Sequence, residues 1–196
     1  MKTLFAVASY LLGSIPTGYL LVRATDRSDI RRSGSRSTGA TNVLRVKGLR
    51  FAIPVVVADV AKGFLPVFFG IRIFHDPALA AFFGFLAAFG HCFPFSIGFK
   101  GGKGMATSMG AYAALALPPF FASLALFVLT VAATRFISLG SILAAASFPF
   151  FLLLLHGPRS AFIWSLAIAA LVLFKHKDNI GRLLGGTERK LGEKTP

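Results

Sequence analysis

The chain has 196 residues, of which 55% are hydrophobic and 14% charged, and its mean hydropathy is +0.73. Because an ordinary soluble domain has about 25% charged residues, this composition excludes a typical water-soluble globule. Lysine and arginine (21) outnumber aspartate and glutamate (7), which gives a formal net charge of +14. Most basic residues lie in short segments between apolar stretches, which leaves no room for a separate nucleic-acid-binding domain. The single cysteine, Cys92, excludes an intrachain disulfide and a metal site of paired cysteines.

Six apolar segments follow one another along the chain, at residues 4–22, 51–73, 78–97, 105–134, 137–156 and 160–174. A membrane-spanning helix needs about 20 residues, so the fourth segment is too long for one crossing. Pro118 and Pro119 divide it, because proline lacks a backbone N–H and disfavours helix at the residue before it. We therefore expect helices at 105–117 and 119–134. The sequence predicts an all-α, polytopic integral membrane protein with about seven transmembrane helices in a single domain, residues 1–196.

Two of these segments need a separate interpretation. The helix expected at 105–117 covers only about 20 Å at 1.5 Å per residue, so we expect it to lie against protein instead of lipid. The first segment, residues 4–22, resembles a signal peptide in length, but its basic flank follows it. We interpret it as a retained spanning helix.

Basic residues are distributed unequally between the two sides that seven spans would create. One side receives residues 23–50, 98–104, 135–141 and 175–196, which carry 17 of the 21 lysines and arginines. By the positive-inside rule this side is cytoplasmic, so the N-terminus is outside and the C-terminus is cytoplasmic. The three basic segments described next lie on the cytoplasmic side of this arrangement.

The first cytoplasmic segment contains a run of small and hydroxyl residues, GSRSTGATNVLR at 34–45. Such a run lets backbone N–H groups and side-chain donors converge on an anion, with fixed charge from Arg36 and Arg45. A flexible basic linker that contacts anionic lipid headgroups explains the same composition. Composition alone leaves both interpretations open.

The second segment has three glycines, Gly101, Gly102 and Gly104, around Lys103. Glycines allow the backbone to fold closely about a phosphate, and a helix that begins near Gly104 would point its N-terminal N–H groups to the same place. The spacing is not that of a nucleotide-binding P-loop, because Ile97 stands at the first glycine position and Gly104 follows the lysine. A glycine-lysine turn that only joins two helices is the alternative.

The third segment follows the last apolar stretch. In a helix, His176 and Asn179 are three residues apart and share a face, with Arg182 nearby. A basic juxtamembrane tail is the alternative interpretation.

Within the second apolar segment, Asp59 and Lys62 are spaced i, i+3, and we interpret them as a structural pair because opposite charges at this spacing satisfy each other.

Six segments of the chain together resemble, in the same order, the bacterial acyl-phosphate:glycerol-3-phosphate acyltransferase family. They are Gly13–Tyr19, Gly34–Arg45, Asp59-x-x-Lys62-Gly63, Gly90–Thr107 with its Phe-Lys-Gly-Gly-Lys-Gly core, Ser138–Ser141 and His176–Glu188. The resemblance extends over nearly the whole chain. One place departs from it: the family's first motif reads Gly-Ser-Gly-Asn-x-Gly-Ala-Thr-Asn, and Arg36 and Ser37 replace its Gly-Asn pair.

The resemblance implies an enzyme that transfers a fatty acyl group from acyl phosphate to glycerol 3-phosphate, giving lysophosphatidate and inorganic phosphate in phospholipid biosynthesis. It implies a bacterial cell (inner) membrane location with a cytoplasmic active site. We expect membrane lipids and the enzyme that supplies acyl phosphate as partners, no nucleic acid, no cofactor and no metal.

The resemblance also assigns roles residue by residue. Catalytic roles are expected for Ser35, Lys103, His176 and Asn179. Substrate-binding roles are expected for Gly39, Asn42, Arg45, Gly101, Gly102, Gly104, Ser141, Arg182 and Glu188. His91 also matches the family and is expected to support the contact between a helix and the glycine loop.

We expect direct attack by the glycerol hydroxyl, with Lys103, Arg45 and the amides of the glycine loop holding phosphate oxygens. The proton goes either to His176 or to the acceptor's own phosphate, whose second pKa is about 6. No histidine is followed five residues later by aspartate, so the dyad expected of acyl-CoA-dependent acyltransferases is absent. The rival function is an organic-anion transporter, which predicts polar groups along the whole bilayer depth, whereas only Asp59 and Lys62 interrupt the middle of the spans.

Overall fold

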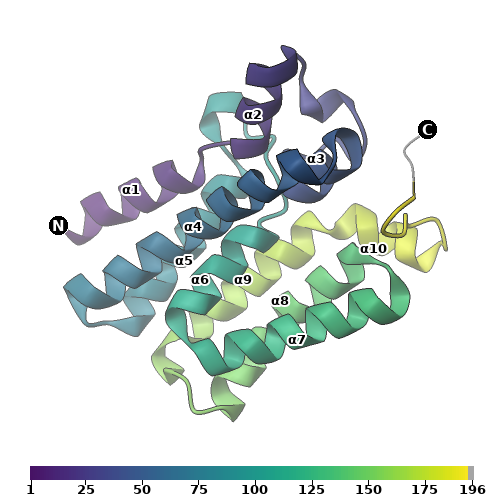
Figure 1. Cartoon of the computed structure of the whole chain (residues 1–196). Helices are drawn as coiled ribbons and strands as arrows, with labels where there is room; N and C mark the ends of the chain where they lie inside the picture. Colours follow the sequence, from purple (N-terminus) through teal and green to yellow (C-terminus); the bar gives the residue numbers. More distant parts are fainter. Residues whose placement is uncertain (194–196) are drawn as a thin grey trace.

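The computed structural model describes residues 1–193, and within this range the chain forms helices and loops with no strand (Figure 1). The α-helices are α1 (Lys2–Gly13), α2 (Thr17–Asp26), α3 (Ala40–Lys47), α4 (Leu49–Phe74), α5 (Pro77–Cys92), α6 (Met105–Leu115), α7 (Leu117–Thr134), α8 (Ile137–Leu154), α9 (Phe162–Lys175) and α10 (Lys177–Leu184). Three short 3₁₀ helices are η1 (Ile30–Arg32), η2 (Phe95–Ile97) and η3 (Arg159–Ala161).

Four helical segments are long and apolar enough to cross a membrane: α4, residues 77–97, α7 and α8. Two bent pairs, α1 with α2 and residues 159–175 with α10, bring the number to six when each pair counts as one span. Helix α6 has 11 residues and therefore covers only about 16 Å, which is too short for a core of about 30 Å. The prediction of an all-α chain with apolar, membrane-type helices is confirmed.

The first apolar segment is not one continuous helix, so the expected helix over 4–22 is corrected to a bent pair, which is apolar enough to count as one broken span. Helices α1 and α2 meet at a bend of 40° around residues 14–16. Pro16 lacks the N–H that would continue the helical ladder. The Ile15 carbonyl at this break instead accepts a hydrogen bond from the Lys62 ammonium at 2.9 Å.

The two prolines do divide the fourth apolar segment, as the sequence predicts. The boundary lies slightly earlier than expected, because α6 ends at Leu115 and α7 begins at Leu117. Pro118 and Pro119 occupy the first turn of α7, where a missing N–H removes no helical hydrogen bond. The short α6 packs against α4 at glycine contacts. A Cβ atom on Gly63 would lie 1.9 Å from the Thr107 carbonyl oxygen, so glycine allows this close approach.

The segments that carry the motifs lie at one end of the bundle. Figure 1 shows α2, α3 and α10 at the end where the chain finishes, and the turns that connect α4 to α5 and α8 to α9 at the opposite end. Helix α7 lies at the side of the bundle and packs mainly against α8, with 11% of its length buried. This arrangement leaves space beside α7, which becomes part of the site.

Candidate active site

The Gly34–Arg45 segment is an ordered structure built around one buried amide. Asn42 is 1% exposed, and its Nδ2 donates to the carbonyls of Ile30, Ser33 and Ser37 at 3.2, 3.1 and 2.8 Å. Its Oδ1 accepts a hydrogen bond from the Ser35 N–H at 2.7 Å. The flexible-linker interpretation is therefore wrong for this segment. Asn42 also lines the cavity, but backbone groups of the loop already use its donors and its acceptor, so its expected substrate-binding role stays a prediction.

This loop brings the predicted residues Ser35, Gly39 and Arg45 to the wall of one cavity. Gly39 is the N-cap of α3, so the N-terminal end of that helix also faces the cavity. A helix N-terminus favours an anion because its first N–H groups lack helical partners. Arg45 is half-buried, and burial lowers the pKa of its guanidinium from the ordinary value. Its Nη2 donates to the Arg189 carbonyl at 3.4 Å.

The glycine loop folds back onto the end of α5. The Gly101 N–H donates to the Cys92 carbonyl at 3.3 Å, and the Gly102 N–H donates to the His91 carbonyl at 3.1 Å. Neither glycine lines the cavity. The expectation that these two amides hold phosphate oxygens is therefore wrong, because the protein's own backbone accepts their hydrogen bonds.

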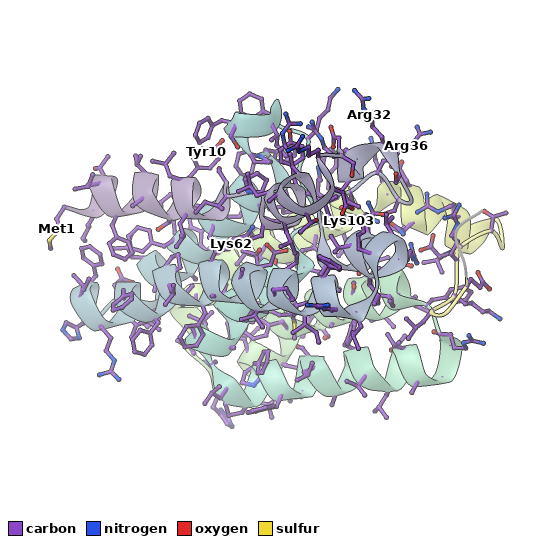
Figure 2. All side chains as sticks on the ribbon, turned by 45° about the horizontal axis from the view of Figure 1, so that its top comes forward. Met1, Tyr10, Arg32, Arg36, Lys62 and Lys103 are labelled. Carbon is purple, nitrogen blue, oxygen red and sulfur yellow. The ribbon has the colours of Figure 1, made fainter. Side chains whose placement is uncertain are left out.

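The remaining part of the loop does reach the cavity. Gly104 is the N-cap of α6 with φ +81°, a backbone conformation that favours glycine, and α6 begins beside it as the sequence predicts. Lys103 and Gly104 both line the cavity. Figure 2 shows Lys103 inside the molecule, whereas Arg32 and Arg36 project outward. Burial lowers the pKa of Lys103 to about 8, with Arg182 and Arg45 adding to the effect and Glu188 opposing it.

The third motif contributes His176 and Asn179, which line the same cavity. His176 occupies the 59° bend between α9 and α10, and its Nδ1 lies 2.8 Å from the Val172 carbonyl oxygen. A carbonyl only accepts, so Nδ1 carries the proton and Nε2 keeps its lone pair. Burial lowers the pKa of His176 to about 4, with Lys103 adding to the decrease. The Asn179 amide accepts a hydrogen bond from the Lys103 ammonium.

Glu188 fixes this arrangement from the other side. Its carboxylate accepts hydrogen bonds from Ser138, Asn179 and Arg182, each at 2.7 Å. Burial raises the pKa of Glu188, but these three hydrogen bonds together bring it below the ordinary value. Arg182 forms an ion pair with Glu188 and is not among the residues that line the cavity, so its expected role in binding substrate stays a prediction.

The cavity has a volume of about 400 Å³ and combines two kinds of wall. Its polar end holds Ser35, Arg45, Lys103, His176 and Asn179. Its other wall is apolar and comes from α4, α6, α7 and α8, through Val56, Val60, Met105, Met109, Phe120, Leu124, Phe127 and Ile137. A ligand with an anionic head and a long apolar chain matches both walls.

The cavity also contains polar residues that the site prediction missed: Ser37, Thr41, Asp59, His91 and Ser138. For Ser138 a signal was available, since it begins the Ser138–Ser141 motif. Predicted Ser141 does line the cavity, and its hydroxyl donates to the Ile137 carbonyl of its own helix at 2.9 Å. Over residues 1–193, no group of three or more His, Cys, Asp or Glu side chains is arranged to hold a metal ion.

Comparison with known proteins agrees with this geometry. The family model described as glycerol-3-phosphate acyltransferase matches residues 3–186. The chain belongs to this acyltransferase family. Proteins named glycerol-3-phosphate acyltransferase from Geotalea daltonii and Geobacter sulfurreducens are each 43% identical to it, over 182 and 190 residues. These alignments cover 93% and 96% of this chain, and 93% and 97% of those proteins.

Solved structures of the acyltransferase family share the fold as well. The crystal structure of PlsY (YgiH), an integral membrane glycerol 3-phosphate acyltransferase, in its glycerol 3-phosphate form, is similar with a TM-score of 0.93. It is 34% identical, and the match covers 97% of this chain and 96% of that chain. The lysophosphatidic acid form of PlsY gives a TM-score of 0.90 at 33% identity and covers 97% of this chain and 95% of that chain. The resemblance found from the six motifs is thus confirmed.

Proposed function

We propose that this chain transfers a fatty acyl group from acyl phosphate to glycerol 3-phosphate, forming lysophosphatidate and inorganic phosphate in phospholipid biosynthesis. The observation that carries the proposal is that a basic end and an apolar wall belong to the same cavity. Glycerol 3-phosphate as acceptor is supported by the names of the relatives and by the glycerol 3-phosphate form of PlsY. Acyl phosphate as donor fits a site whose cationic groups, Lys103 and Arg45, can hold phosphate oxygens.

The acyl chain belongs against the apolar wall. Val56 and Val60 of α4 face this space from one side, and Phe120, Leu124 and Phe127 of α7 face it from another. Burial of methylene groups there is favourable by about 0.8 kcal/mol for each. The acyl chain of the substrate therefore has a defined direction in the cavity. Its carbonyl carbon lies toward Lys103, and its methyl end lies toward the apolar helices.

The phosphates belong at the polar end, held by two cations and two helix termini. Lys103 and Arg45 supply charge, and the N-terminal ends of α3 and α6 supply backbone donors near Gly39 and Gly104. These groups take the role that the sequence prediction gave to the amides of Gly101 and Gly102.

The transfer needs alignment and charge neutralisation more than strong acid or base catalysis, because phosphate is a good leaving group. The acceptor hydroxyl oxygen attacks the acyl carbonyl carbon, a new C–O ester bond forms, and the C–O bond to phosphate breaks. Lys103 and Arg45 stabilise the negative charge that develops. The hydroxyl proton passes to the acceptor's own phosphate, whose second pKa is about 6. His176, with a pKa of about 4, is a weaker base and serves to position substrate.

The orientation in the membrane forms part of the same proposal. Seven helices cross or enter the bilayer, with the N-terminus outside, the C-terminus in the cytoplasm and the cavity open to the cytoplasmic face of the bacterial inner membrane. The charge bias of 17 of 21 basic residues supports this orientation. Figure 1 shows the start of α1 and the helix α10 at opposite ends of the bundle, which supports an odd number of crossings. The enzyme that makes acyl phosphate is a partner on the same face.

Reconstitution of the purified protein into liposomes tests the proposal. Inorganic phosphate should be released from acyl phosphate when glycerol 3-phosphate is present, together with lysophosphatidate. Lys103→Ala should abolish this release, whereas Lys100→Ala should not, because Lys100 lies in the same loop but outside the cavity. Uptake of labelled glycerol 3-phosphate without acyl transfer would instead establish a transporter.

A further inference from the structure

The imidazole of His91 fills the space directly beneath Gly102. A Cβ atom on Gly102 would lie 2.0 Å from Nε2 of His91, closer than real Cβ contacts come. The Gly102 N–H also donates to the carbonyl of the same histidine at 3.1 Å. The glycine at position 102 is therefore explained by contact with the side chain of His91 on α5, which also lines the cavity.

His91 belongs to a buried polar cluster, which we define as Thr17, Asp59, Lys62 and His91. Asp59 is 1% exposed, and its Oδ1 lies 3.6 Å from Nδ1 of His91 and 2.8 Å from the Lys62 ammonium. His91 Nδ1 is buried and has no hydrogen-bond partner within the described residues. The facing carboxylate at 3.6 Å favours the tautomer with a proton on Nδ1, so Nε2 faces the glycine loop as an unprotonated ring edge.

The buried cluster extends to the break between α1 and α2. The Thr17 hydroxyl donates to Asp59, and Lys62 donates to the Ile15 carbonyl at 2.9 Å. A buried charge that loses its partner is costly, so these groups constrain one another strongly. The break, α4, α5 and the glycine loop are thereby joined through one set of contacts, and the loop has little freedom to move toward His91.

We infer that His91 is a positioning residue for acyl transfer. Its imidazole, which lies next to Asp59, fixes the position of Gly102. The position of Gly102 in turn directs the Lys103 ammonium to Asn179 and the substrate phosphate. Lys103 follows Gly102 directly, so a displacement of the glycine moves the ammonium with it. A misplacement of about 1 Å in a catalytic constellation costs about 10²-fold in rate. The inference rests on the proposed function for its kinetic part, whereas the contact itself can be tested without turnover.

A double-mutant cycle with Gly102→Ala and His91→Ala tests the inference. We expect each single substitution to lower kcat/KM for glycerol 3-phosphate by about 10²-fold. In Gly102→Ala the new methyl group clashes with the His91 imidazole, and in His91→Ala the imidazole that contacts Gly102 is missing. In the double variant the added methyl group occupies the space left by the imidazole. Its kcat/KM should therefore be no lower than that of the worse single variant. Losses that multiply, so that the double variant falls by about 10⁴-fold, would overturn the inference.

Measuring Tm for the same four proteins tests the contact between His91 and Gly102 without depending on acyl transfer. Gly102→Ala should lower Tm, and His91→Ala in the same chain should recover part of that loss even where no turnover is measured. Additive changes in Tm would overturn the contact. Gly181→Ala is the matched control, because a Cβ atom there meets nothing within 4 Å. If the Gly102→Ala protein does not insert into the membrane, the His91→Ala variant alone tests the inference. A kcat/KM of His91→Ala within twofold of the parent overturns it. A loss of kcat/KM that is partly recovered in His91→Gln supports it.

Discussion

The Lys103 ammonium donates a hydrogen bond to the amide oxygen of Asn179, 76 positions away in the chain. The amide nitrogen of Asn179 in turn donates to Glu188 at 2.7 Å. Asn179 therefore links a cation to a carboxylate without bringing them into direct contact, and among residues 1–193 Lys103 forms no ion pair. The lysine is held in position while its charge stays available to a substrate phosphate.

The buried state of Lys103 predicts an alkaline limit to activity. Its pKa is lowered to about 8, so the ammonium is present below that pH and lost as the pH rises through it. We expect kcat/KM to fall on the alkaline side with a midpoint near pH 8, because kcat/KM reports groups of the free enzyme. The measurement is the pH profile of phosphate release, corrected for acyl phosphate that decomposes without enzyme.

Substitution by arginine provides the control for that assignment. A guanidinium has a pKa above about 12, so Lys103→Arg should move the alkaline limit out of the measured range in whatever activity remains. Lys100→Arg should leave the limit unchanged, since Lys100 lies outside the cavity. A profile of the parent enzyme that stays flat to pH 10 contradicts the assignment.

Sequence patterns predicted the helices and the motifs because these depend on local chemistry. Hydropathy indicated the apolar segments, and the Pro118-Pro119 pair indicated the division that the structure confirms. The direction of backbone donors was not accessible in the same way. Gly101 and Gly102 match a phosphate-binding pattern, yet their N–H groups point to carbonyls of α5, which lies next to them only after folding. Asn42 likewise resembles a substrate ligand in sequence, and its role inside the loop depends on the path of residues 30–37.

Orientation in the membrane is open to a direct test with single cysteines introduced after Cys92→Ala. Arg50→Cys and Lys190→Cys should be protected from an impermeant thiol reagent in intact cells and labelled only after lysis. Arg159→Cys should be labelled from outside. All three positions are exposed in the folded chain, so accessibility depends on the side of the membrane alone. Labelling of position 50 or 190 in intact cells would reverse the proposed orientation.

Arg36 occupies a backbone conformation that suits glycine, the residue of the family motif at this position. Its φ is +56°, and the left-handed region costs a non-glycine residue about 1–2 kcal/mol. Glycine loses more conformational entropy on folding, which offsets about 0.5–1 kcal/mol of this gain. Arg36→Gly should therefore raise the free energy of unfolding by about 0.5–1 kcal/mol, or Tm by a few degrees.

The matched substitution Arg32→Gly removes the same exposed charge from η1, where φ is not in the left-handed region. It should lower Tm or leave it unchanged. Equal Tm shifts in the two variants would attribute the effect to charge and not to the backbone. Ser37 needs no reversion, because its hydroxyl accepts the Gly39 N–H at 3.2 Å and so closes the turn.

The last prediction concerns the proton acceptor. His176 donates from Nδ1 to the Val172 carbonyl and has a pKa of about 4, so it is neutral and weakly basic at pH 7. An asparagine amide supplies a donor in a similar place without useful basicity. We expect His176→Asn to retain kcat within about tenfold of the parent with the same acidic pH limb. His176→Ala should lose more, because alanine supplies no polar side chain to position substrate and removes the side-chain hydrogen bond to the Val172 carbonyl. A general base contributes about 10²–10⁴-fold. A loss of that size in His176→Asn, with the acidic limb flattened, would identify His176 as the base and remove that role from the acceptor phosphate.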